Sequence, residues 1–173
     1  SAGRGELQKV AKWLRKGGLV DALGSTSTED GKTASFGLLH AAARNGQLEM
    51  ARELLKRGAS VDLPSSTGRT ALMTAAAQGH RSIVLLLLQH SANPDLQANY
   101  GDTALMAAAY HGKEACVQAL LRAKANTKLR TKKGDTALLW AEAKNHTAIA
   151  KLLRQHASCL SLGLGVALCA VVP

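Results

Sequence analysis

Gly101-Asp102-Thr103-Ala104-Leu105 has two near copies in the same chain, Gly68-Arg69-Thr70-Ala71-Leu72 and Gly134-Asp135-Thr136-Ala137-Leu138. The copies lie 33 residues before it and 33 residues after it. Further landmarks recur with nearly the same period, namely Gly46, Gly79, Gly112 and Asn145, and the leucine pairs 54–55, 87–88, 120–121 and 152–153. Three kinds of landmark that share one period indicate an internal repeat, and repeats of this length stack into an elongated array.

Each period is expected to form a turn, a short helix, a tight reversal and a longer helix. Gly68 suits a left-handed turn, and the Thr70 hydroxyl can accept a hydrogen bond from the first free amides of a helix that starts at Ala71. Gly79 suits the end of that helix. Apolar residues at three- and four-residue spacing over 82–88 then predict an amphipathic second helix, which Pro94 prevents from continuing.

These motifs resemble the ankyrin repeat, whose pattern combines a Gly-x-Thr-Pro-Leu-His helix start, a Gly-His break and a Leu-Leu-x-x-Gly-Ala helix end. Leu39-His40-x-Ala42 and Leu54-Leu55-Lys56-Arg57-Gly58-Ala59 match closely. Later repeats depart from it, with Ala71, Ala104 and Ala137 in place of proline, and Met73, Met106 and Leu139 in place of histidine. The resemblance implies an all-α solenoid of stacked helix-turn-helix units with short hairpin tips, which binds proteins in a concave groove.

The repeat divides the chain into seven segments. We expect a partial N-terminal repeat at 1–23, an irregular insertion loop at 24–37, repeats at 38–64, 65–97, 98–130 and 131–158, and an apolar tail at 159–173. The insertion follows from an offset of 41 residues between the first two repeats, and residues 28–33 still suggest a hairpin tip. The tail has no helical stripe, so we expect little order beyond about Ser161.

The composition fits such an array. Hydrophobic residues make up 46% of the chain and aromatic residues 3%, so Ala and Leu have to fill the interior. The three cysteines show neither a metal-ligand spacing nor a disulfide framework, which favours a reducing compartment. Residues 1–12 lack the apolar run of a secretory signal, and the apolar stretch 160–172 is shorter than the ~20 residues of a membrane span. We expect the protein to be cytoplasmic, nuclear or both, with no membrane partner.

No catalytic constellation emerges from the sequence. The six histidines fall mostly at helix starts, breaks or ends, and the Gly-x-Thr turns lack the spacing of a phosphate-binding loop. Cys116 lies beside Val117 on the apolar face of a second helix and is expected to be buried. We therefore expect no enzyme, no cofactor and no metal site.

The expected binding surface is the groove formed by the hairpin tips and the exposed ends of the first helices. Mapped through the repeat, it takes in Arg69, Gln78, Asn99, Tyr100, Asp102, Tyr110, His111, Arg130, Lys132, Lys133, Asp135 and Lys144. Tyrosines next to basic residues are typical of interface hot spots, because tyrosine joins a large apolar area to a polar tip.

The formal net charge of +10 favours acidic partners. Our first hypothesis is a monomeric adaptor or scaffold that binds a protein or peptide, preferably an acidic segment with an apolar anchor. The second is electrostatic binding of nucleic acid or of a phosphorylated ligand by the basic C-terminal repeats, against which stand Asp102 and Asp135 at the same tips. The third is a substrate-recruiting part of a larger enzyme complex.

Overall fold

The computed structural model describes residues 23–27 and 33–161, together with residues 9, 12, 16 and 21. In this part of the chain there are two strands and eight helices. They are β1 (Leu23–Ser27), β2 (Thr33–Gly37), α2 (Leu38–Arg44), α3 (Leu48–Lys56), α4 (Ala71–Gln78), α5 (Arg81–Gln89), α6 (Ala104–Tyr110), α7 (Glu114–Arg122), α8 (Ala137–Ala143) and α9 (Thr147–Ser161).

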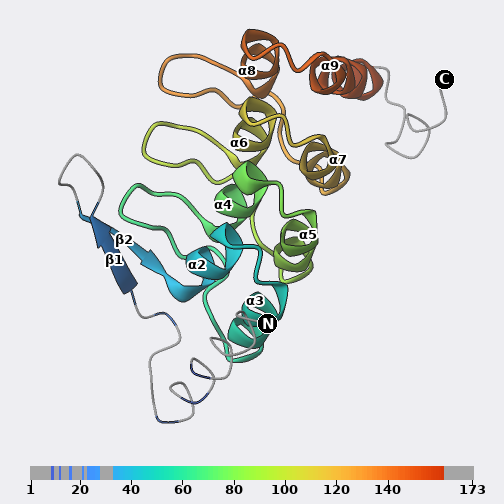
Figure 1. The fold of residues 1–173 in the computed structure, drawn as a ribbon. Helices are drawn as coiled ribbons and strands as arrows, with labels where there is room; N and C mark the ends of the chain where they lie inside the picture. Colours follow the sequence, from blue (N-terminus) through green and yellow to red (C-terminus); the bar gives the residue numbers. More distant parts are fainter. Residues whose placement is uncertain are drawn as a thin grey trace.

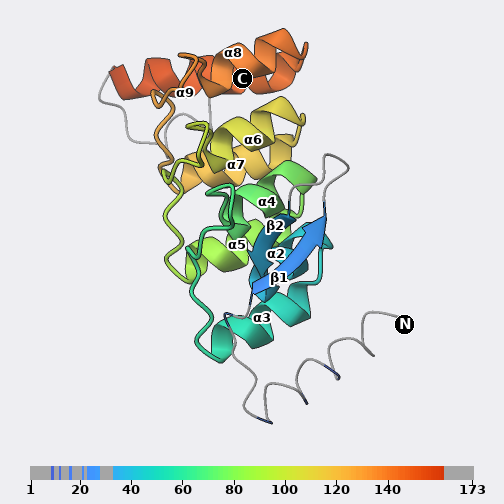
Figure 2. The ribbon, with the colours of Figure 1, turned by 90° about the vertical axis from the view of Figure 1, so that its left-hand side faces the viewer.

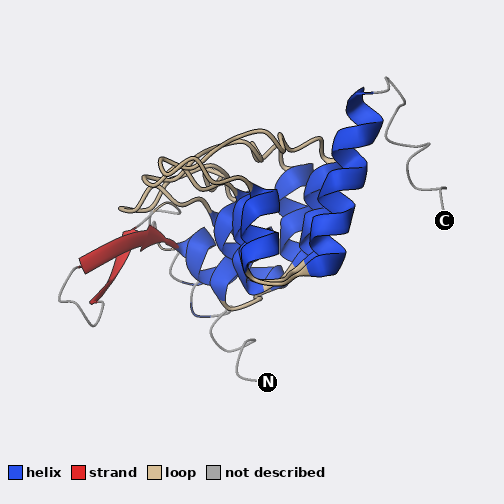
Figure 3. Ribbon diagram, turned by 90° about the horizontal axis from the view of Figure 1, so that it is seen from above, coloured by secondary structure: helices blue, strands red, loops and turns tan. Residues whose placement is uncertain are grey.

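The helices pack in pairs, and the pairs stack along the array (Figure 1). The first helices α2, α4, α6 and α8 form one row, and the second helices α3, α5, α7 and α9 form the other (Figure 1). Figure 2 shows the array from the side on which the β1–β2 hairpin lies. The loops between successive pairs, which we call fingers, project to one side of the first row, as does the β1–β2 hairpin (Figure 3). The predicted all-α solenoid of stacked helix-turn-helix units is confirmed.

The ends of the first helices follow the expected capping chemistry. The hydroxyls of Thr70, Thr103 and Thr136 each accept a hydrogen bond from the backbone N–H three residues later, with an N to Oγ1 distance of 3.3 Å. Each hydroxyl thereby satisfies one of the amides left unpaired at the start of a helix. At the other end of α4, Gly79 adopts the left-handed conformation with φ of +86°. In α4, a threonine and a glycine therefore set the two ends of the helix.

Small side chains allow the first helices to stack closely. Ala75, Ala76 and Ala108 of the first helices are fully buried, and so are Leu54 and Leu87 of the second helices, all in one continuous core. No single helix pair buries its own apolar surface, so each repeat depends on its neighbours for stability.

The last repeat has one face that no further first helix covers among the described residues. Met73 and Met106 are 1% exposed beneath the next repeat, but Leu139, at the same position of α8, is 46% exposed. The exposure of Leu139 therefore follows from its place at the end of the described array.

The segment before α2 differs from the expectation. The sequence predicted an irregular insertion loop at 24–37, but β1 and β2 pair antiparallel there, with Leu23 opposite Gly37 and Ser27 opposite Thr33. The other fingers close with a tight turn, whereas this one is longer and has enough backbone to form a five-residue ladder. The extra residues thus extend a finger into a β-hairpin.

Several expectations lie wholly or mainly outside the described residues, namely the partial repeat at 1–23, the predicted tip at 28–33 and the tail from residue 162 onwards. Asp21 is described, and its carboxylate accepts hydrogen bonds from the Ser60 backbone N–H and hydroxyl, at 3.0 and 2.5 Å. The carboxylate of Asp62 accepts likewise from the backbone N–H of Asn93 in the next repeat. At the other end α9 runs to Ser161, beyond the predicted end of the repeat at 158. Across the described stretches, no helix combines the length and apolarity needed to cross a membrane.

Candidate binding groove

Hydrogen bonds fix the backbones of the fingers to one another. The Asn99 N–H donates to the carbonyl of Thr67, and the Lys132 N–H donates to the carbonyl of Tyr100, both at 3.0 Å. The Gln97 side-chain amide donates to the carbonyls of Gly101 and Arg130, at 2.8 and 2.9 Å. These bonds join successive fingers into a continuous strip, so the surface beside them is formed before any ligand binds.

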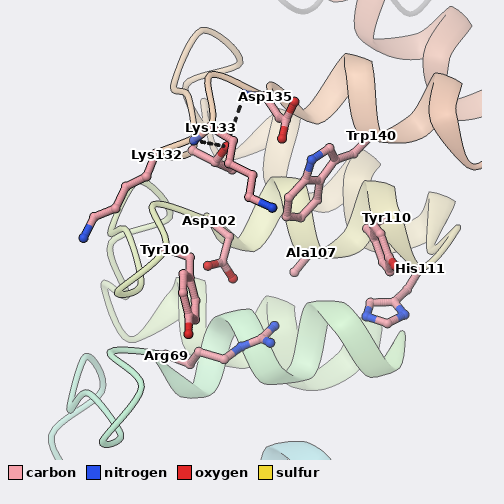
Figure 4. Close-up of a pocket in the computed structure, with 11 residues that line it drawn as sticks. Arg69, Tyr100, Asp102, Ala107, Tyr110, His111, Lys132, Lys133, Asp135 and Trp140 are labelled. Atoms are coloured by element: carbon pink, nitrogen blue, oxygen red, sulfur yellow. Dashed lines mark hydrogen bonds between the residues drawn. The ribbon is translucent and has the colours of Figure 1, made fainter.

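A cavity of about 610 Å³ lies where two fingers meet the exposed faces of α6 and α8 (Figure 4). We call it the groove. It is lined by Arg69, Tyr100, Asp102, Ala107, Tyr110, His111, Thr131, Lys132, Lys133, Asp135 and Trp140. A cavity of this size is in the range of small-molecule and peptide side-chain sites.

Three aromatic side chains, those of Tyr100, Tyr110 and Trp140, line the groove. Tyr100 is 76% exposed at the finger tip and Tyr110 is 38% exposed at the end of α6. The Tyr110 ring meets the edge of half-buried Trp140, with centroids 5.3 Å apart and planes at 66°. The His146 Nε2 lies 3.2 Å from the Tyr110 carbonyl oxygen, and the Lys144 ammonium lies 4.4 Å from the Tyr110 ring centroid. Tyr110 is therefore held from several sides while part of its ring stays open to a ligand.

The groove carries charges of both signs. Figure 4 shows Asp102 between Tyr100 and Ala107, while Lys133 extends toward Trp140 and Lys132 extends away from the groove. The three ion pairs formed among the described residues lie elsewhere, at Arg52–Glu49, Arg57–Glu53 and Arg154–Glu142. The charged side chains of the groove therefore form no ion pair with another described residue.

His111 lies at the end of α6 and forms an edge contact with Tyr110, with ring centroids 5.0 Å apart. Partial burial lowers the pKa of His111 below 6.5, and the positive charges of Arg69, Lys113, Lys144 and His146 lower it further. The surroundings of His111 therefore have a positive potential.

The groove brings together eight of the twelve residues that the sequence analysis assigned to the binding surface: Arg69, Tyr100, Asp102, Tyr110, His111, Lys132, Lys133 and Asp135. The other four do not line it. Asn99 and Arg130 donate side-chain hydrogen bonds to the carbonyls of Ser66 and Gly134, within the finger strip. Lys144 lies over the Tyr110 ring, and Gln78 is exposed at the end of α4.

The sequence analysis did not assign Ala107, Thr131 and Trp140 to the groove, although all three line it. Ala107 and Trp140 occupy the same repeat position, one helical turn before Tyr110 and Ala143. Residues three apart share a helix face, so this spacing was the signal that pointed to Trp140.

The described residues do not form a metal site, and the Cys116 thiol is not in a reactive environment. They contain no group of three or more His, Cys, Asp or Glu side chains placed to hold a metal ion. Cys116 is buried as predicted, and desolvation raises the pKa of its thiol, which disfavours the reactive thiolate.

Comparison with known families agrees with this architecture. The family model described as "Ankyrin repeats (3 copies)" matches residues 2–98 and 90–161, and no catalytic domain is identified. A search of curated proteins returns no match to the chain. Because the matched segments span most of its length, the chain belongs to the ankyrin-repeat family.

Proposed function

We propose that this chain is a non-catalytic adaptor or scaffold that binds a segment of a partner protein in the groove. Ankyrin repeats are in general protein–protein interaction modules. The observation that carries the proposal is exposed Tyr110 packed against Trp140, with exposed Tyr100 in the same groove on a finger that is hydrogen-bonded to the next one. Rigid aromatic side chains lose little conformational freedom when they bind a ligand. Such side chains are typical of interface hot spots.

The preferred ligand is an acidic segment with an apolar anchor. The anchor packs on the apolar floor of Ala107, Tyr110 and Trp140, and acidic side chains of the ligand approach Arg69 and Lys133. The net charge of +10 attracts such a segment at long range. Asp102 and Asp135 disfavour an unbroken run of acidic residues, so the register of charges along the ligand sets the specificity.

The test is selection of binders from a displayed library of random peptides, followed by affinity measurement at low and moderate salt. We expect enriched peptides to join an aromatic or aliphatic residue to nearby Asp or Glu, and to lose binding to a Tyr110→Ala, Lys133→Glu variant. Undiminished binding to this variant would remove the groove from the proposal.

The same variant distinguishes the alternatives in affinity capture from cell extract. Capture dominated by nucleic acid and lost between low and moderate salt would replace the adaptor with an electrostatic nucleic-acid binder. Capture of an enzyme together with its substrate would make the chain the recruiting part of that complex. We expect partners from the cytoplasm or nucleus, where the three cysteines stay reduced.

A further inference from the structure

Beside the groove, positive side chains from three repeats converge around His111. Arg69 comes from the preceding finger, Lys113 follows α6, and Lys144 and His146 follow α8. Figure 4 shows Arg69 and His111 at the same edge of the groove, on the side away from Lys132 and Asp135. We call this group the basic cluster.

The positions of these side chains are set by the repeat stacking. The ring of His146 packs over Gly112, where an added Cβ would lie 2.7 Å from His146 Cε1, and its Nε2 lies 3.2 Å from the Tyr110 carbonyl oxygen. The aliphatic stem of Lys113 packs over Gly79 in the same way, because a Cβ there would lie 2.9 Å from its Cδ. The Lys144 ammonium lies 4.4 Å from the Tyr110 ring centroid, and the His111 ring contacts the same ring with centroids 5.0 Å apart. Lys144 and His111 therefore flank Tyr110 at one end of the groove, which Arg69 also lines.

No carboxylate forms an ion pair with the basic cluster among the described residues. The groups whose charges lower the pKa of His111 are Arg69, Lys113, Lys144 and His146, and none of them is a carboxylate. Glu142, on α8, is paired with Arg154. Figure 4 shows Asp102 on the Arg69 side of the groove, between Tyr100 and Ala107, and Asp135 at the opposite edge.

A structural role at the end of α6 does not account for so many positive groups. The carboxyl end of a helix carries about half a negative charge, which one basic side chain already balances. Here three permanent cations and two histidines gather beside a helix of 7 residues. The excess positive charge fits an anion with a charge near −2 and several acceptor oxygens.

We propose that the basic cluster binds a phosphorylated side chain of the partner protein, with Arg69, His111 and Lys144 donating to the phosphate oxygens. The inference rests on the proposed function, because the rest of the ligand lies in the adjoining groove. Arginine donates two parallel hydrogen bonds to a phosphate, and a phosphate monoester has the required charge near pH 7. Tyr110 and Trp140 are placed to contact the carbon atoms next to the phosphate.

The test uses phenyl phosphate as a probe, with benzyl alcohol as the uncharged aromatic control, at pH 7.5. Nuclear magnetic resonance follows the His111 ring signals and the Trp140 indole. We expect phenyl phosphate to shift both signals and to raise the pKa of His111, since a bound dianion favours the imidazolium. Absence of a shift at His111 would overturn the proposal.

Two double variants that remove the same charge distinguish binding by the basic cluster from attraction by the overall positive charge of the protein. Arg69→Gln with Lys144→Gln should weaken phenyl phosphate binding about tenfold or more, as expected for loss of charge-assisted hydrogen bonds. Lys56→Gln with Lys128→Gln removes the same charge at exposed sites outside the cluster and should change the affinity less than about twofold. Equal losses in the two variants would contradict the proposal, and circular dichroism verifies that both retain the fold.

Two further measurements identify what has failed if the result is negative. Unphosphorylated peptides that still bind in a Tyr110-dependent manner would leave the adaptor function standing and remove the phosphate site alone. Loss of all peptide binding would remove the function itself. A single-stranded oligonucleotide that binds more tightly than a phosphopeptide, with a steep salt dependence, would reassign the cluster to nucleic acid.

Discussion

His40 is a polar side chain buried in the interior of the array. Its Nε2 lies 2.8 Å from the carbonyl oxygen of Arg69, and its Nδ1 is buried without a hydrogen-bond partner. Burial lowers the pKa of His40 below 6.5, although the bond to Arg69 opposes the shift. Met73 and Met106 occupy the same position in later repeats. His40 therefore joins two repeats as a neutral imidazole and makes the array sensitive to acid.

The pH dependence of stability follows from the direction of this shift. Because the folded state has the lower pKa, the unfolded chain binds the proton more tightly. The contribution of His40 is complete above about 6.5 and decreases as the pH falls below 6.5 toward the folded-state pKa. We expect the free energy of unfolding, measured in urea, to fall between pH 7.5 and pH 5.5.

The His40→Met variant tests whether His40 causes this pH dependence, since later repeats have methionine at the same position. At pH 7.5 the variant should lose about 1 kcal/mol, because the hydrogen bond to the Arg69 carbonyl is gone. Its stability should then depend less steeply on pH than that of the wild type. Parallel pH profiles for the two proteins would show that His40 is not the acid-sensitive group.

Within each repeat, local chemistry decides where an element begins and ends, and this is why much of it could be predicted. Thr70, Gly68 and Gly79 were assigned to a cap, a turn and a helix end from sequence, and the structure has them in those roles. The β1–β2 hairpin could not be predicted in this way, because its Gly, Ser, Thr and Ala residues show no strand pattern. Pairing there depends on the length of the finger and not on side-chain periodicity.

Capping of α6 gives a prediction with a built-in control. Thr103→Ala removes the hydroxyl that accepts from the Met106 N–H and should cost about 1 kcal/mol of stability in urea unfolding. Thr103→Ser keeps the hydroxyl and should lose less. If serine and alanine were equally destabilising, the buried methyl group and not the cap would account for the effect.

Stacking of the fingers gives a second prediction, from two glycines of similar conformation. Gly101 and Gly134 have φ of +85° and +89°, but a Cβ on Gly101 would lie 2.9 Å from the Lys132 backbone nitrogen, whereas one on Gly134 meets nothing within 4 Å. Gly134→Ala should cost about 1–2 kcal/mol, the strain of a left-handed alanine. Gly101→Ala should cost clearly more, because a backbone atom has to move. Equal losses in thermal and urea unfolding would mean that the fingers are not in close contact.

At the scale of the whole molecule, the 33-residue period predicted most of the groove residues from the sequence. Tyr100, Asp102 and Tyr110 were found because finger tips and helix ends recur at fixed positions. Trp140 was missed because the mapping followed helix ends and left out the position one turn earlier. Asn99 and Arg130 were assigned to the surface, but their side chains hydrogen-bond between and within fingers, which composition does not reveal.

The central claim is that a partner binds in the groove and not elsewhere on the apolar surface of the array. The most direct measurement is the affinity of a library-selected peptide for Tyr110→Ala and for Leu139→Ala, by isothermal titration calorimetry. The two side chains are similarly exposed, at 38% and 46%, but Leu139 lies at the end of the array and does not line the groove. We predict that Tyr110→Ala loses about 2 kcal/mol, roughly 30-fold in affinity, and that Leu139→Ala binds like the wild type. A larger loss for Leu139→Ala, or no loss for Tyr110→Ala, would contradict the account.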